Sequence, residues 1–246
     1  MKLKLYLISA RWFIVSLLLS NTCTTAMASR TDDSLALVAL HEVLTFSWNL
    51  SQPMTTWQGV TLVANGRVSE LWATPTGGIL PAAIGDLTEL TSLEMSEADL
   101  AGRIPESITN LTKLTYLNLN ENDLEGPIPR NIGLLSQLEY LDLSDNKLEG
   151  EIPGSIWQLG NLTYLSIGEN STLTGTISPE IANLTKLEWL TITDTKLTGG
   201  IPVEIGQLSA LKYLYLEENQ LTGSIPPEMG DLTSLERLTL GQNDLS

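Results

Sequence analysis

Two sets of side chains recur at a fixed interval along the chain and could form a binding surface. Aromatic residues recur every 24 or 25 residues, and acidic residues follow them by five positions. The aromatic column consists of Tyr116, Tyr140, Tyr164, Trp189 and Tyr213, with Ser92 before it and Arg237 after it. The acidic rim consists of Glu97, Glu121, Asp145, Glu169, Asp194 and Glu218, with Gln242 after it. Exposed aromatic rings make good contacts for a peptide, a protein loop or a sugar, and a row of carboxylates attracts cations.

Each set also has a purely structural interpretation. Tyrosine at this position could simply shield the structure beneath it, and the acids could form a solvated edge that keeps an elongated protein soluble. Carboxylates about 5 Å apart in water repel by about 0.8 kcal/mol per neighbouring pair, so the rim opposes folding unless salt, a cation or a basic partner offsets it. We take the aromatic column and the rim acids from Glu121 to Glu218 as the candidate ligand-binding residues.

Residues suited to catalysis or to metal binding are few. The chain has one histidine, His41, and one cysteine, Cys23, which lies in a segment that we expect to be removed on export. His41 has no partner at a metal-ligand spacing, and the acidic rim lacks the spacing of a dedicated calcium loop. Hydrolysis by two carboxylates needs an acid of raised pKa beside an ionised one, and no pair is distinguished in this way. The sequence therefore predicts no enzyme, no cofactor and no metal site.

The interval that spaces both sets is also the interval of the leucines. These recur every 24 residues, with one step of 25, at Leu87, Leu111, Leu135, Leu159, Leu184, Leu208 and Leu232. One unit, from Leu114 to Gly133, has the pattern L-x-x-L-x-L-x-x-N-x-L-x-G-x-I-P-x-x-I-G. This pattern is a leucine-rich repeat, and each unit should form one coil of a stacked solenoid.

Within each unit the L-x-L pair alternates with the period of a strand, so Leu117 and Leu119 should point into the core from a parallel sheet. The asparagine of each turn should point inward and form a ladder with backbone groups of adjoining coils. The ladder is Asn122, Asn146, Asn170, Asn219 and Asn243, and Ala98 and Thr195 interrupt it. The fourth regular coil should contain a bulge, because it has an extra residue near Ser171 or Thr172 and a serine, Ser178, where proline is usual.

The second half of the repeat carries a resemblance to a known class of proteins. Gly-x-Ile-Pro recurs at Gly102–Pro105, Gly126–Pro129, Gly150–Pro153, Gly199–Pro202 and Gly223–Pro226. It resembles the plant-type leucine-rich repeat, which is found in receptor-kinase ectodomains and polygalacturonase-inhibiting proteins. The resemblance implies an α/β repeat solenoid, a right-handed superhelix with a concave parallel β-sheet and an N-terminal helical cap. It also implies that a partner binds on the concave face.

The segment before the repeats resembles the N-terminal cap of the same class. The matching residues are Ser47-Trp48-Asn49, Trp57-Gln58-Gly59-Val60 and Gly66-Arg67-Val68. This cap normally contains a pair of cysteines, and Thr55 and Leu62 occupy their places here. We therefore expect packing alone to hold the cap.

The N-terminus has the features of a secretory signal peptide. Two lysines precede an apolar run around residues 13–19, and Ala26-Met27-Ala28 supplies a cleavage site before Ser29. Loss of residues 1–28 removes three cations and no acid, so the formal charge of −16 becomes −19 in the mature chain. Such an acidic protein is not expected to bind nucleic acid.

The chain is divided accordingly into a signal peptide at 1–28, an N-terminal cap at 29–65 and a leucine-rich-repeat domain at 66–246. The domain has one degenerate and seven regular repeats, of which the last is incomplete. A short amphipathic helix over 31–44 should cover the first coil. No segment after the signal peptide is apolar enough to span a membrane. We expect a secreted or cell-surface protein.

The C-terminal end lacks the polar capping unit that solenoids usually need. The chain ends at Ser246, directly after Asn243-Asp244-Leu245. Either the protein is a truncated member of a longer family, or the open end docks on another molecule such as a second copy.

These observations predict a secreted binding module that recognises a protein or peptide, of basic character, on its concave face. A carbohydrate is an alternative partner. Two other functions fit the same sequence. One is a structural or adhesion protein that associates through its uncapped C-terminal end, and the other, suggested by the resemblance alone, is an inhibitor of a polysaccharide-degrading enzyme.

Overall fold

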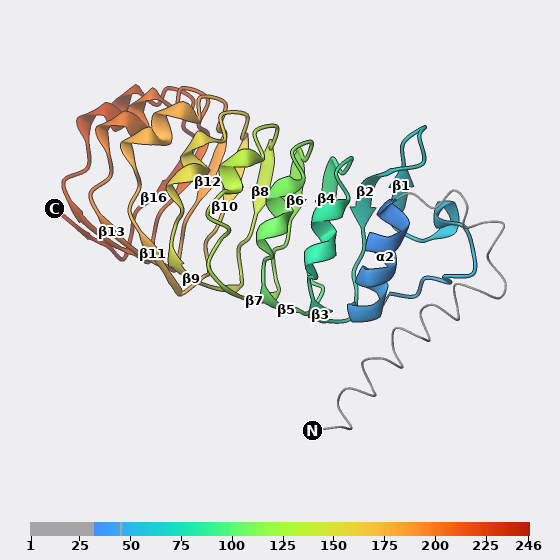
Figure 1. Ribbon diagram of the computed structural model, residues 1–246. Coiled ribbons are helices and arrows are strands. Elements are labelled where there is room, and N and C mark those ends of the chain that lie inside the picture. Colours follow the sequence, from blue (N-terminus) through green and yellow to red (C-terminus); the bar gives the residue numbers. More distant parts are fainter. Residues whose placement is uncertain (1–31, 45) are drawn as a thin grey trace, which may run out of the picture.

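The computed structural model describes residues 32–44 and 46–246, which form a solenoid of stacked coils with the helix α2 at its N-terminal end (Figure 1). A regular coil contains a short strand of a first sheet, a short strand of a second sheet and a short 3-10 helix. The predicted signal peptide and Cys23 lie outside the described residues.

The first sheet has the strand order β1-β2-β4-β6-β8-β10-β12-β14-β16. Its strands are β1 Val60–Leu62, β2 Val68–Trp72, β4 Ser92–Glu94, β6 Tyr116–Asn118, β8 Tyr140–Asp142, β10 Tyr164–Ser166, β12 Trp189–Thr191, β14 Tyr213–Tyr215 and β16 Arg237–Thr239. Only β1 pairs antiparallel within this described sheet, and it extends the sheet into the cap. The parallel strands pair equivalent residues, for example Tyr164 with Trp189. This register brings each repeating position into one column.

The second sheet has the order β17-β15-β13-β11-β9-β7-β5-β3. Its strands are β3 Gly78–Ile79, β5 Leu100–Arg103, β7 Asp123–Gly126, β9 Lys147–Glu151, β11 Thr172–Gly175, β13 Lys196–Gly199, β15 Gln220–Gly223 and β17 Asp244–Leu245. The 3-10 helices are η2 Met54–Thr56, η3 Ala82–Asp86, η4 Glu106–Asn110, η5 Ile132–Leu134, η6 Gly154–Gln158, η7 Pro179–Asn183, η8 Val203–Gln207 and η9 Pro227–Asp231. Most of the repeat helices follow an extended proline of the Ile-Pro pair, which fixes the backbone before the turn.

The leucines and isoleucines of the repeat fill the space between the two sheets and the 3-10 helices. Leu117 and Leu119, which the alternation predicts to point inward, are 1% and 0% exposed. The equivalent residues of the other coils belong to the same continuous core. The predicted leucine-rich-repeat solenoid with a parallel sheet is confirmed.

The asparagine ladder is also confirmed. The buried amide of Asn170 donates to the carbonyls of Leu143, Ile167 and Gly168, and its Oδ1 accepts from the backbone N–H of Leu148, 2.9 Å away. Asn122, Asn146, Asn219 and Asn243 make equivalent bonds. At the interruption, the Thr195 hydroxyl bonds to Oδ1 of Asn219. Each ladder residue thereby joins its own turn to the preceding coil.

The helix expected over 31–44 is α2, Asp32–Val43, and it covers the first coil. Leu37, Leu40 and Leu44 are fully buried beneath it. The buried Asp33 connects this helix to the sheet, because its carboxylate accepts the backbone N–H of Val68 at 2.6 Å and pairs with Arg67 Nε at 2.6 Å. The cap is therefore held by an ion pair as well as by packing, which the sequence pattern did not reveal.

The fourth regular coil is irregular, as the extra residue predicts. Thr172 pairs with Glu149 in the preceding coil, one residue beyond the offset that other strands of this sheet follow. The turn glycine of this coil, Gly175, has a φ of 123°, whereas Gly126 and Gly150 have φ values of 75° and 79°. Ser178, which replaces proline, caps η7 by accepting the backbone N–H of Glu180 at 3.2 Å. The coil absorbs its extra residue by a local change of backbone and register.

Candidate binding surface on the concave sheet

The structure brings the five predicted aromatic side chains into one continuous stack on the concave sheet. Neighbouring ring centroids lie 4.4, 4.3, 5.6 and 4.6 Å apart along the series from Tyr116 to Tyr213. The three tyrosines of β6, β8 and β10 are nearly parallel, with interplanar angles of 14° and 8°. Each ring is half-buried. Since the faces cover one another, the stack offers ring edges and hydroxyls to a ligand, and this arrangement leaves few open faces for a sugar.

Carboxylates of the same sheet hold the tyrosine hydroxyls. The Tyr116 hydroxyl donates to Glu94 Oε2 at 3.0 Å, and the amide of Asn118 donates to the same oxygen. Tyr164 and Tyr140 both donate to Oδ2 of Asp142, at 3.3 and 3.4 Å. Asp142 is 5% exposed and is nevertheless part of the concave sheet. The carboxylates fix the orientation of the rings before any ligand arrives.

These contacts change the proton affinity of the tyrosines. Burial, and then the charge of Asp142, raise the pKa of Tyr140 and of Tyr164. Burial, and then the hydrogen bond to Glu94, raise the pKa of Tyr116. The three phenols therefore stay protonated and act as donors to the carboxylates over the whole neutral range.

The acidic rim lies at the turn that follows each concave strand, and all of its side chains are exposed. Its residues and Gln242 have φ values between 45° and 57°. This left-handed conformation is unfavourable for residues other than glycine, asparagine and aspartate, yet four of the positions carry glutamate. Partial burial, and then the charges of Asp145, Asp194 and Glu121, raise the pKa of Glu169. The rim acids therefore repel one another at neutral pH.

Two further aromatic residues join this surface that the repeat pattern did not single out. Tyr215 contacts Trp189 with a centroid distance of 5.3 Å. Trp72 is 57% exposed, and its indole N–H donates to the Ser92 hydroxyl at 3.0 Å. Both occupy the outward position inside the L-x-L pair, as do Glu94 and Asp142. The period-two alternation contained this second column, and only the first column was predicted from it.

The described part of the chain contains no group of three or more histidine, cysteine, aspartate or glutamate side chains that could hold a metal ion. Within the same residues no helix has both the length and the apolar character needed to cross a bilayer.

Sequence models of leucine-rich repeats match three parts of the chain, at residues 113–135, 137–159 and 185–245. No curated protein sequence matches it.

Three solved structures indicate its relatives. The leucine-rich-repeat ectodomain of the Arabidopsis thaliana membrane receptor kinase GASSHO1/SCHENGEN3, in complex with CASPARIAN STRIP INTEGRITY FACTOR 2, is 40% identical over 69% of this chain, with a TM-score of 0.67. A plant ice-binding protein is 26% identical over 88% of this chain and 87% of its own, with a TM-score of 0.67. The plant peptide hormone receptor RGFR1, in complex with RGF2, is 32% identical over 77% of this chain, with a TM-score of 0.56.

The chain spans 20% of the GASSHO1/SCHENGEN3 structure and 38% of the RGFR1 structure. The matched part of the former is its ectodomain. The matching repeat models, the stacked coils and these likenesses together show that the chain is a leucine-rich-repeat protein.

Proposed function

We propose that this protein is an extracellular binding module that recognises a basic peptide, or a basic segment of a protein, on its concave sheet. The observation that carries the proposal is the continuous aromatic stack, which is fixed by carboxylates on one side and flanked by the acidic rim on the other. The ligand would contact Tyr116, Tyr140, Tyr164, Trp189 and Tyr213 through ring edges, and Glu121, Asp145, Glu169, Asp194 and Glu218 through charge. The receptor ectodomains that it resembles were solved with peptide partners, which supports the same use of this face.

The basic character of the ligand follows from the unbalanced charge of the surface. Of the ion pairs found among the described residues, none involves the acidic rim. The nearby Lys212 is already paired with Glu188 at 2.6 Å. A lysine or arginine placed along the rim would replace repulsion by attraction, and its aliphatic stem would pack on the ring edges. Export through the signal peptide at 1–28 is part of this proposal.

A peptide library displayed on phage tests the proposal, because selection does not require the natural ligand to be identified. Selection on the wild-type protein should enrich lysine and arginine. A rim variant with Glu121→Lys, Asp145→Lys and Glu169→Lys should bind the selected peptides at least about 10-fold more weakly.

The matched control reverses three exposed acids of the second sheet, Glu125→Lys, Glu149→Lys and Glu151→Lys. It has the same net charge as the rim variant, so it should keep most of the affinity if the concave face is the site. Equal losses in the two variants, or enrichment of neutral or acidic peptides, would contradict the proposal. The adhesion alternative predicts that neither variant alters self-association through the C-terminal coil, which light scattering would measure.

Ice is a second candidate ligand, and one feature of the second sheet favours it. Thr174, Thr198 and Thr222 occupy the same position in three successive coils, and Thr172 and Thr176 flank the first of them on the same face. Strands of a sheet lie about 4.8 Å apart, so the threonines present regularly spaced hydroxyl and methyl groups. The plant ice-binding protein resembles the chain over most of the length of both.

This candidate is tested by ice-recrystallisation assays. The wild-type protein should inhibit recrystallisation, and Thr198→Lys should abolish the inhibition because it places a charge within the threonine column. Thr112→Lys, at an exposed site outside the second sheet, is the control. A wild-type protein without inhibition would remove ice from consideration and leave the peptide proposal untouched.

A further inference from the structure

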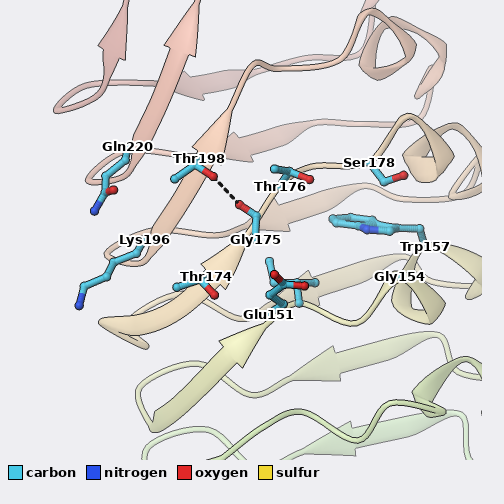
Figure 2. A pocket seen from close by; sticks show the side chains of 11 residues that line it. Glu151, Gly154, Trp157, Thr174, Gly175, Thr176, Ser178, Lys196, Thr198 and Gln220 are labelled. Atoms are coloured by element: carbon cyan, nitrogen blue, oxygen red, sulfur yellow. Dashed lines mark hydrogen bonds between the residues drawn. The ribbon is translucent and has the colours of Figure 1, made fainter.

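The irregular fourth coil leaves a hollow on the outer side of the second sheet, away from the aromatic column. Its volume is about 440 Å³, and it opens between β9, β11 and β13. Figure 2 shows Glu151 and Thr176 on either side of this space, with the indole of Trp157 extending toward it from η6. Small-molecule sites in proteins have volumes of roughly 300 to 1,000 Å³.

Trp157 explains why the hollow lies at this coil. The equivalent residue is glycine in several other coils, and a Cβ at Gly85, Gly133 or Gly206 would lie only 2.3 to 2.5 Å from a carbonyl oxygen of the next coil. The regular stacking therefore has no room for a side chain here. Trp157 is nevertheless 1% exposed and is followed by the coil with the extra residue. The longer coil and the large indole accompany each other, and together they reshape this part of the wall.

The hollow combines an apolar base with groups that exchange hydrogen bonds. Trp157 and Ile152, both buried, form the base. The Thr174 hydroxyl donates to the Gly150 carbonyl at 2.9 Å, so its oxygen can still accept a bond from a ligand. Glu151 supplies a carboxylate, and Lys196 an ammonium group, at opposite edges of Thr174 in the strand register. Their charges offset each other, unlike those of the acidic rim.

We infer that this hollow binds a neutral oligosaccharide. Sugar hydroxyls act as donors to Glu151 and as both donors and acceptors with Thr174 and Thr176, while the C–H face of a sugar ring packs on the apolar base. The lining extends from Glu151 in β9 to Gln220 in β15, a span on the order of 14 Å for strands about 4.8 Å apart. That length suits a chain of several sugar units better than a single one. The site is independent of the peptide surface on the concave sheet.

Gly154 offers a way to block the site without disturbing the fold. It lines the hollow, and a Cβ added to it would have no heavy atom within 4 Å. Gly230, in the equivalent 3-10 helix η9, has the same free space and lies outside the hollow. Gly154→Phe is therefore the blocking variant, and Gly230→Phe is its matched control.

Calorimetric titration with neutral hexasaccharides of glucose, mannose and xylose tests the inference, with a uronic-acid hexamer as the charged comparison. At least one neutral probe should bind the wild-type protein, and Gly154→Phe should weaken that binding by at least about 10-fold while Gly230→Phe leaves it within about two-fold. Glu151→Gln, which removes a charged acceptor from an exposed position, should weaken it by about 10-fold.

Three results would overturn the inference. They are the absence of binding to all neutral probes, unchanged binding in both Gly154→Phe and Glu151→Gln, and tighter binding of the uronic-acid hexamer. The rim variant should bind the neutral probe as the wild-type protein does, so a failure here is distinguishable from a failure of the peptide proposal.

Discussion

Polar groups inside the solenoid and polar groups on its concave rim are arranged in opposite ways. Inside, Asp33 is fully buried and bonded to both Arg67 and the backbone of Val68, and Asn170 makes four hydrogen bonds from a fully buried position. On the rim, Glu169 is exposed, lies in a left-handed backbone conformation and faces like charges on both sides. The interior groups therefore stabilise the fold, whereas the rim opposes it. The difference teaches that the rim is retained for something other than stability, which agrees with a ligand that supplies the missing positive charge.

The largest effect should come from the buried carboxylate of the cap. Asp33→Ala leaves the Val68 N–H and the Arg67 guanidinium without their acceptor and should lower the free energy of unfolding by about 3 kcal/mol. Urea unfolding at neutral pH measures this loss. Asp123→Ala is the control, because its ion pair with Lys147 is exposed and should contribute little. A cap variant as stable as the wild type would show that packing alone holds the cap.

A ladder residue should come next. Asn170→Ala removes bonds to three carbonyls and one N–H that are otherwise buried, and we expect a loss of about 2 kcal/mol. Asn161→Ala, which changes an asparagine bonded near the surface, should cost much less. Equal losses at the two positions would mean that the ladder contributes no more than a surface hydrogen bond.

The aromatic column should lie between interior and rim. Tyr140→Ala removes a half-buried ring that stacks on both neighbours, so the free energy of unfolding should fall by about 1 to 1.5 kcal/mol. Tyr140→Phe keeps the stack and should cost less. If the two variants were equally stable, the hydroxyl bond to Asp142 rather than the stacking would be the main contribution.

The stacked tyrosines also predict an alkaline transition. Their pKa values are raised in the folded protein, whereas tyrosine in the unfolded chain ionises near pH 10. Above that pH the folded state binds more protons than the unfolded state, so stability falls as the pH rises. Absorbance at alkaline pH should show late ionisation of these phenols, together with a falling urea midpoint. Ionisation of all tyrosines near pH 10 without loss of structure would contradict the observed contacts.

The smallest effect should have the opposite sign. Glu169→Gln removes one of the repelling rim charges, and it should raise the free energy of unfolding by less than about 0.5 kcal/mol at low salt. Because the pKa of Glu169 is raised in the folded state, its unfavourable contribution appears as the pH rises through that value and vanishes below it. The gain should also disappear in about 1 M salt, where charges are screened beyond about 3 Å. A loss of stability in the variant would place the rim with the interior groups and remove the contrast.

Much of the fold and of the candidate surface follows from the sequence period. The L-x-L alternation correctly assigns Leu117 and Leu119 to the core, and the 24-residue interval aligns Tyr116 with Tyr140 because each coil adds the same number of residues. The inward asparagines and the irregular fourth coil were predictable for the same reason. A repeating sequence turns a one-dimensional spacing into a three-dimensional column.

The sequence by itself determined the repeat, the core face of each strand and the two columns of side chains. Only the tertiary structure decided which groups they bond, because the partners lie in other coils. Asp33 reaches Arg67 and Val68 across 34 and 35 residues, and Tyr164 reaches Asp142 across 22. The left-handed turns of the rim and the hollow beside Trp157 likewise arise from backbone geometry and from the stacking of unequal coils. Neither can be read from a pattern that treats every repeat as equivalent.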